Sequence, residues 1–235
     1  MLMDDLDYEN RSSKIYGVVT AIVTNNKDPE KMGRVKVTYP WLAEEDESHW
    51  ARIATMMAGN DRGTYFIPEI EDEVLVAFEH GDIHYPYIIG ALWNGKDKVH
   101  ENNDDGENNL RVIKSRSGHK IIFDDKNGSE KVTIIDKSEQ MTIVLDSKSK
   151  NIDISNKNGK INIVASDDIN IESDKNVNIK TGQNFIVSAG SNAEVKANSS
   201  VNVKASSSGT FEANASLTLK SGGVNTIKGA IVKLN

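Results

Sequence analysis

Apolar and polar residues alternate in short runs between residues 14 and 93. Turn formers such as Asp28-Pro29 and Gly81-Asp82 separate the runs, and no run keeps a 3.6-residue period long enough for a helix. The runs cover residues 15–24, 34–39, 50–57, 63–67, 73–78 and 87–93. Alternation with a period of two predicts strands with one buried face. Short strands within about 80 residues favour a small antiparallel barrel, of the OB type first and of the SH3-like type second.

A stronger pattern fills the chain from residue 156, where apolar residues recur at every eighth position. The central position of each unit is apolar in nine units out of nine, and we expect it to form the core of a stalk. These residues are Ile163, Ile171, Ile179, Val187, Val195, Val203, Phe211, Leu219 and Ile227. The position two residues earlier is mostly apolar, and the position two residues later is always small, from Ala165 to Gly229.

Each octad therefore predicts one short strand followed by one corner. The residues between the apolar positions are mostly Asn, Thr, Lys, Glu or Ser, and the remaining positions, such as 166–168 and 206–208, are turn formers. The apolar face and the unpaired edges of such a strand have to be covered. One solution is a single-chain β-helix with three octads in each coil, and the other is a triangular β-prism of three intertwined chains. A single-chain coil would impose a longer period, and the sequence shows none, so the uniform octad favours a homotrimer.

Composition separates these two patterns and sets the domain boundaries. All four Pro, all three Trp and all six Tyr precede residue 94, and residues 94–109 are rich in Gly, Asn and Asp, as is typical of a linker. Five apolar runs follow at irregular spacing, and we expect them to be strands that lead into the stalk: 111–119, 120–125, 131–135, 141–145 and 151–154. The predicted division is an N-terminal arm (1–13), an OB-type barrel (14–93), a linker (94–109), stalk-leading strands (110–155) and an octad-repeat trimeric β-helix spike (156–235). The fold class is all-β.

Charge and cysteine content exclude several classes of protein. The 235-residue chain has 28 Lys and Arg against 35 Asp and Glu, a formal net charge of −7. This sign argues against a protein held to nucleic acid or anionic lipid by its overall charge. Without Cys there is no disulfide framework, thiolate catalysis or cysteine-ligated metal. The first residues do not form a basic region followed by an apolar one, so we expect no signal peptide and assembly in the cytoplasm.

No constellation of residues predicts an enzyme, a metal or a cofactor. His80 and His84 flank a predicted hairpin turn, where a spacing of four does not align them as it would on a helix. His119 is expected to make structural hydrogen bonds where the stalk begins, and the acidic run at residues 44–47 to form an exposed loop. An OB barrel that binds single strands needs a basic, aromatic groove. Residues 14–93 instead have 7 Lys and Arg against 13 Asp and Glu, so Trp41, Trp50 and Trp93 are expected to be core or interface aromatics.

Four ordered motifs resemble the spike part of the VgrG family, which includes type VI secretion spikes and the central spikes of phage baseplates. They are residues 26–41 (NKDPEKMGRVKVTYPW), 63–78 (GTYFIPEIEDEVLVAF), 81–95 with Gly81-Asp82 and YIIGALWNG, and 115–125 (SRSGHKIIFDD). The resemblance implies an OB-type barrel followed by a trimeric β-helix that leads the tube of a contractile injection machine through the target envelope. A trimeric fibre or adhesin stalk is the alternative that the octads alone would allow, with an OB-fold nucleic-acid-binding protein behind it.

The resemblance also implies partners at both ends of the spike. The members of the family that belong to secretion systems carry a large hub domain before the barrel, and only about 13 residues precede it here, so we expect the hub to be a separate protein or to have been removed. The octad pattern loosens after Leu219 without a polar cap and without a His-x-His pair. We therefore expect a blunt apolar platform that receives a PAAR-like tip protein through Ile227, Gly229, Ile231, Val232, Leu234 and Asn235. The membrane of the target would be met only transiently, on firing.

Overall fold

The computed structural model describes residues 14–42 and 47–233, and within them the regular structure is all-β. A single 3₁₀ turn, η1 (Glu79–Gly81), accompanies twelve strands, and none of the described residues lies in a helix long and apolar enough to cross a membrane. The chain divides into two compact units, one up to Ile163 and one from Val164 onward. Each unit is described by itself below.

The first part of unit 1 is a closed five-stranded barrel. Its strands are β1 (Val19–Asn25), β2 (Lys36–Thr38), β3 (Arg52–Ile53), β6 (Glu73–Phe78) and β7 (Pro86–Ala91), arranged in the order β2-β1-β6-β7-β3. Neighbours are antiparallel except β3 and β7, which are parallel. Val35 and Ala51 exchange two backbone hydrogen bonds, of 3.0 and 2.7 Å, and these close the sheet by joining the segment before β2 to the segment before β3.

Small and β-branched side chains fill the barrel. The buried apolar residues are Ala21, Val23, Val35, Val37, Tyr39, Ala51, Val74, Val76, Phe78 and Ile88. The tryptophans were expected in the core or at an interface, and Trp41 and Trp93 do not lie in the core, since they are 50% and 68% exposed. Tyr39 and Phe78 are the aromatic members of this core, and the aliphatic residues around them fill the rest of the interior. For these two residues, Trp41 and Trp93, the expectation of an interface position remains.

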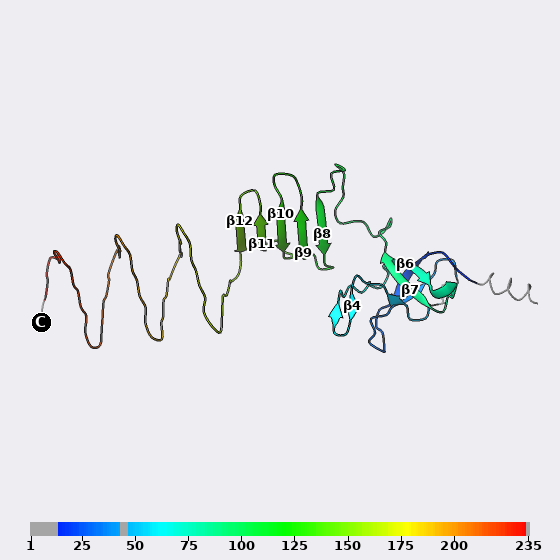
Figure 1. The fold of residues 1–235 in the computed structure, drawn as a ribbon, viewed down its shortest axis with the longest axis horizontal. Coiled ribbons are helices and arrows are strands. Elements are labelled where there is room, and N and C mark those ends of the chain that lie inside the picture. Colours follow the sequence, from blue (N-terminus) through cyan, green and yellow to red (C-terminus); the bar gives the residue numbers. More distant parts are fainter. Residues whose placement is uncertain (1–13, 43–46, 234–235) are drawn as a thin grey trace, which may run out of the picture. The chain divides into compact units, whose positions relative to one another are not determined.

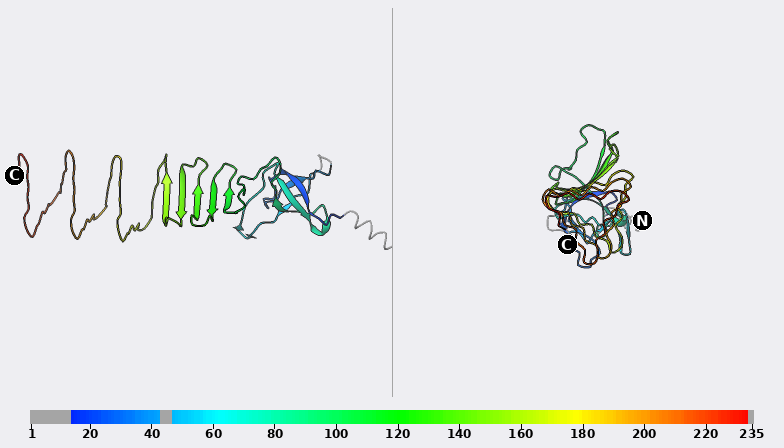
Figure 2. Two further views of the ribbon diagram at one scale, coloured as in Figure 1. Left: turned by 90° about the horizontal axis from the view of Figure 1, so that it is seen from above. Right: turned by 90° about the vertical axis from the view of Figure 1, so that its left-hand side faces the viewer.

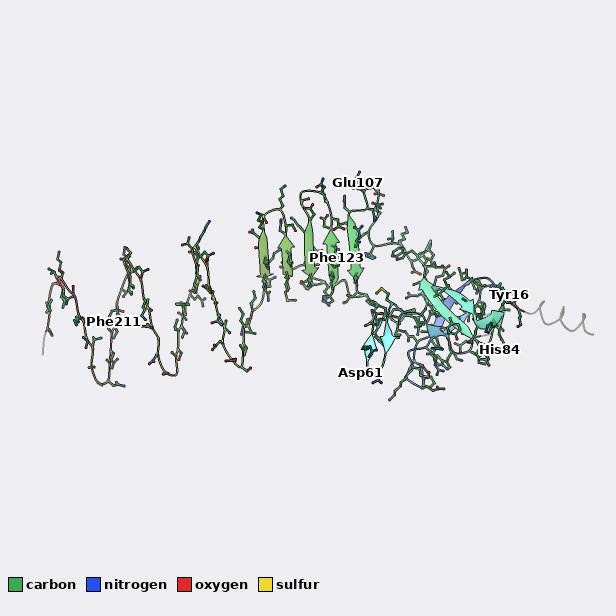
Figure 3. The ribbon with its side chains drawn as sticks, in the orientation of Figure 1. Tyr16, Asp61, His84, Glu107, Phe123 and Phe211 are labelled. Atoms are coloured by element: carbon green, nitrogen blue, oxygen red, sulfur yellow. The ribbon has the colours of Figure 1, made fainter. Side chains whose placement is uncertain are left out.

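A two-stranded hairpin, β4 (Ala58–Gly59) and β5 (Arg62–Gly63), extends from the segment between β3 and β6. Asp61 lies at its tip (Figure 3) in the left-handed region, with a φ of 54°. Gly63 has a φ of 151°, and a Cβ atom placed on it would lie 2.5 Å from the carbonyl oxygen of Met57. Only glycine therefore fits this side of the hairpin without displacing the backbone.

The five runs predicted between residues 110 and 155 each form a strand. They are β8 (Leu110–Lys114), β9 (Lys120–Asp124), β10 (Lys131–Ile135), β11 (Met141–Asp146) and β12 (Asn151–Asn156). Each strand pairs antiparallel with the next, so the sheet is a simple meander in the order β12-β11-β10-β9-β8 (Figure 1). Its hairpin turns contain Gly118 and Gly128, both with positive φ, in the way that short connections between antiparallel neighbours require.

Unit 2 is an extended coil that bends at regular intervals. Two-residue bends occur every eight residues, at 166–167, 174–175, 182–183, 190–191, 198–199, 206–207, 214–215, 222–223 and 230–231. They coincide with the corners that the octads predict. The end-on view in Figure 2 shows the successive coils overlying one another around a common axis.

The strands predicted between these corners are not paired in the single chain. No strand is assigned within residues 157–233, and residues 161–233 make no backbone–backbone hydrogen bond. A strand is defined by the ladder it forms with a neighbour, and one octad segment has no neighbour within its own chain.

Candidate assembly interface

One face of the β8–β12 meander carries a row of isoleucines that crosses all five strands. Ile113 pairs with Ile121, Ile121 with Ile134, Ile134 with Ile143, and Ile143 with Ile154. Since side chains two residues apart share a face, a second row on this face consists of Arg111, Phe123, Val132, Leu145 and Ile152. Figure 3 labels Phe123 in this sheet. The face is therefore almost wholly apolar.

This apolar face is open to solvent in the single chain. The exposed fractions of the five isoleucines run from 38% at Ile121 and Ile143 to 63% at Ile154. The face lines a trough of about 830 Å³, at which Phe66 from the barrel segment also lies. The opposite face is mixed, because it includes a charged row in which Lys131 stands between Asp124 and Asp146. Only the isoleucine face needs to be covered by another apolar surface.

The nine central octad residues, of which all but Ile163 belong to unit 2, are more exposed than the meander isoleucines. Their exposed fractions lie between 67% at Ile179 and 79% at Val195. Phe211, labelled in Figure 3, belongs to this column and is 75% exposed. The large apolar residues two positions before the central ones are also exposed, from 51% at Ile169 to 63% at Phe185. A long apolar stripe and an unpaired backbone therefore occur on the same segment.

The residues predicted to bind a tip protein are only partly described. Ile227, Ile231 and Val232 are 68%, 79% and 49% exposed, and Gly229 lies between the last two bends. Leu234 and Asn235 lie outside the described residues. The described part of this segment thus presents exposed apolar side chains.

A carboxylate cluster fixes the loop that leads into β2. The Arg34 guanidinium donates to both oxygens of Asp28, from Nε at 2.9 Å and from an Nη atom at 2.8 Å. Backbone N–H groups of Glu30 and Met32 donate to the same carboxylate at 3.0 and 2.9 Å. The hydrogen bonds from Arg34, followed by those from the backbone, hold the pKa of Asp28 well below its ordinary value. Within the first family-like motif, residues 28–34 are therefore held together by one carboxylate just before β2.

The histidines serve as local hydrogen-bonding groups. His84 Nδ1 lies 2.8 Å from Asp82, and its ring lies beside that of His49 at an interplanar angle of 56°, with ring centres 5.2 Å apart. His80 lies in η1 with a φ of 49° and does not join them at a metal site. Within the described residues, no group of three or more His, Cys, Asp or Glu side chains is arranged to hold a metal. His119 Nδ1 accepts a hydrogen bond from the backbone N–H of Lys137 at 3.2 Å, which joins two neighbouring hairpins of the meander.

Two features of this surface were not predicted. Residues 50–57 and 63–67 were expected to be strands, but only Arg52–Ile53 of the first run and Gly63 of the second lie in strands. The apolar residues that flank the β4–β5 hairpin stay exposed, since Met56, Tyr65 and Phe66 are 89%, 82% and 67% exposed. The isoleucine row was not predicted either. The sequence did contain the information needed to predict the row. Five strands joined by short turns form a meander, and in a meander the residues on one face of each strand lie beside those of its neighbours.

Comparison with known proteins identifies the barrel. The profile described as the type VI secretion system/phage-baseplate injector OB domain matches residues 19–93, which are the five barrel strands and their connections. The chain is VgrG-like, since it is similar to type VI secretion system spike proteins of the VgrG group. It is 30% identical over 145 residues to the type VI secretion system spike protein VgrG1a of Pseudomonas aeruginosa, a match that covers 55% of this chain and 23% of that protein.

Two further relatives extend the comparison. VgrG1c of Pseudomonas aeruginosa is 36% identical over 93 residues, which cover 36% of this chain and 13% of the relative. VgrG3 of Vibrio cholerae is 29% identical over 113 residues, which cover 45% of this chain and 11% of the relative. The VgrG-like chain therefore spans less than a quarter of the length of each of these relatives. The match confirms the OB-type barrel over the SH3-like alternative.

Proposed function

We propose that the VgrG-like chain is the structural central spike of a contractile injection machine, and that it works as a homotrimer. The observation that carries the proposal is the apolar octad stripe of unit 2, which lies exposed on a segment whose backbone is unpaired, in a chain whose barrel matches the injector OB domain. The proposed role is mechanical and not enzymatic. It uses no cofactor.

Three chains account for unit 2 better than one. A single-chain β-helix would need ladder hydrogen bonds between successive coils, and residues 161–233 make none. Two further copies, wound between the coils of the first, would provide both the ladder partners and the apolar cover. In that arrangement the nine central residues of each chain face the axis, and the small residues such as Ala165 lie at the corners.

The meander supports the same assembly in a different way. Its strands already pair with one another through backbone hydrogen bonds within a single chain, so only its isoleucine face remains to be buried. Three such faces directed at one axis would form a second triangular prism, made of separate sheets. The core of the trimer would then begin at Ile113, well before the first octad.

A closed prism suits the transmission of axial force. Every layer of the proposed stalk is bonded to the layers above and below it, and no free edge remains on which it could peel. Burial of an apolar side chain of this size contributes about 1.5–3 kcal/mol, and the repeated contribution of nine layers resists dissociation. The spike would sit at the tube tip under the baseplate hub and pierce the target envelope on contraction.

Partners are proposed at each end. A separate hub protein would bind at the barrel, where the exposed Trp41 and Trp93 provide apolar contact. A PAAR-like tip protein would bind through residues 227–235. The machine would assemble in the cytoplasm and deliver the spike outside. A trimeric fibre or adhesin would share the stalk, and the injector-type barrel argues for a spike instead.

Three experiments test the trimer, the spike role and the tip site in turn. Light scattering of the purified chain should give the mass of three copies of 25.9 kDa, and a mass of one copy would overturn the trimer. Co-expression with hub and tube proteins encoded beside the chain should place it at the end of assembled tubes in electron micrographs. If the chain is trimeric but binds nowhere on the tubes, the proposed stalk is retained and the proposed role as a spike is overturned. For the tip, a truncation lacking residues 227–235 should stay trimeric and lose a candidate tip protein in a pull-down.

A further inference from the structure

The net charge of the chain conceals a reversal of sign along it. Residues 1–109 hold 10 Lys and Arg against 22 Asp and Glu, whereas residues 176–235 hold 6 Lys against 2 Glu, a net charge of +4. The overall value of −7 therefore describes the part of the chain that precedes the meander and not the far part of the stalk. The negative overall charge therefore does not exclude binding of an anionic surface by residues 176–235.

Five of the six lysines of this segment share one position of the octad. Lys180, Lys196, Lys204, Lys220 and Lys228 each follow a central apolar residue directly. Each of them is also the second residue before a bend. They therefore form a column, which we call the lysine column, at a spacing set by the repeat. Ser188 and Glu212 occupy the same position in the two other octads of the segment, as Glu172 does just before it, and Glu194 pairs with Lys196 at 2.8 Å.

The lysine column faces away from the central apolar column. Successive side chains of an extended segment point to opposite sides, so a residue that follows Val195 or Val203 lies on the outer face if the valine lies on the inner one. All five lysines are exposed in the chain, and the Lys196 side chain is 80% exposed. This step rests on the proposed trimer, which would display three lysine columns and a charge of about +12 on this part of the stalk.

We propose that the lysine column binds the anionic phosphate headgroups of the target membrane as the spike enters it. Juxtamembrane lysines are attracted to anionic bilayers, and the attraction grows with each added charge. A threefold set of columns would meet the bilayer from every side of the stalk. The binding would be electrostatic and reversible, because unit 2 has no segment apolar enough to insert.

The composition of the segment favours a membrane over nucleic acid. No Arg follows Arg116, although Arg is the residue that recognises phosphates and bases in fixed geometry. The aromatic residues of unit 2, Phe185 and Phe211, belong to the two apolar columns and are not free to stack on bases. Point charges on flexible stems suit a diffuse anionic surface.

The test compares two variants of equal charge. In the column variant the five lysines are replaced by Gln, and in the control variant Lys126, Lys137, Lys148, Lys150 and Lys157 of the meander are replaced by Gln. These control lysines are exposed as well, but they lie among acidic residues such as Asp124, Asp136 and Asp146. Light scattering establishes first that each variant has the mass of the wild-type protein, which separates failure of this proposal from failure of the trimer.

Binding is then measured by co-sedimentation with vesicles, either zwitterionic or containing about a third anionic phospholipid. Wild-type protein should bind the anionic vesicles only, and less as salt is raised from about 0.1 to 0.5 M. The affinity of the column variant for these vesicles should be lower by at least about tenfold, and the control variant should bind like the wild type. A column variant with Arg in place of Lys should retain binding. Equal binding by the column and control variants would overturn the proposal, and so would binding of duplex DNA in place of vesicles.

Discussion

Two neighbouring residues of the stalk provide a sharp test of which face is buried. Val187 belongs to the central apolar column and is 69% exposed in the single chain, and Ser188 follows it on the other side of the same segment. We expect Val187→Asp to break the trimer and Ser188→Asp to leave it intact. Both variants add one negative charge per chain, so their long-range electrostatics are the same.

The magnitude follows from the surface that assembly would cover. Full burial of a valine side chain contributes about 1.5–3 kcal/mol, and scaling by the exposed fraction gives about 1–2 kcal/mol per chain, or about 3–6 kcal/mol per trimer. Three uncompensated carboxylates at one axis add a desolvation cost of several kcal/mol each. The dissociation constant should therefore rise by at least about two to four powers of ten.

Light scattering over a dilution series measures this change directly. Val187→Asp should dissociate or aggregate at concentrations where the wild type stays trimeric, and Ser188→Asp should match the wild type within about 0.5 kcal/mol. Thermal unfolding of the barrel serves as the internal control, because neither substitution lies in it. If Ser188→Asp dissociated and Val187→Asp did not, the assignment of inner and outer columns would be reversed.

Three further predictions concern unit 1. In the barrel, Ile88→Ala should lower the free energy of unfolding by about 2–5 kcal/mol, with a clearly smaller loss for Ile89→Ala because Ile88 is 2% and Ile89 44% exposed; equal losses in urea titrations would contradict this core. Because the pKa of Asp28 is lowered on folding, its ionised form stabilises the barrel above its ordinary pKa of 3.8, and this stability is lost as the pH falls below that value. Asp28→Asn should therefore melt lower at neutral pH and show a flatter dependence of melting temperature on pH, and an unchanged profile would refute the role of the cluster. On the meander, Ile134→Asp should weaken the trimer in light scattering while Thr133→Asp, on the opposite face, should not, and the reverse order would show that the other face is buried.

The barrel illustrates how much a local pattern can reveal. Period-two alternation located its strands, and the turn formers located their ends, because both depend on residues close in sequence. The closure between Val35 and Ala51 and the parallel pairing of β3 with β7 join segments far apart in the chain. Alternation carries no information on such pairings. For the same reason, alternation left open whether the tryptophans lie in the core or at an interface, and the structure leaves Trp41 and Trp93 exposed.

The stalk shows the opposite limit. The octad gave the position of each corner, and the bends of unit 2 fall at those positions. The partner of each strand could not be read from the period alone, because one repeat is compatible with a coil of one chain or of three. In the meander, the sequence placed every strand but not the isoleucine row. The row depends on the register between hairpins, which the length and type of each turn determine.

The central claim, that the central octad residues of three chains meet at one axis, can be tested with single cysteines. The chain contains no Cys, so Val195→Cys and Lys196→Cys each introduce the sole thiol, on the inner and the outer side of one segment. Disulfides form only when the Cα atoms are about 4.4–6.8 Å apart. Mild oxidation should link two of the three chains in Val195→Cys, seen as a dimer and a monomer on a denaturing gel, and should leave Lys196→Cys monomeric. Linkage through residue 196 without linkage through residue 195, or no linkage at either, would contradict an intertwined trimer with this register.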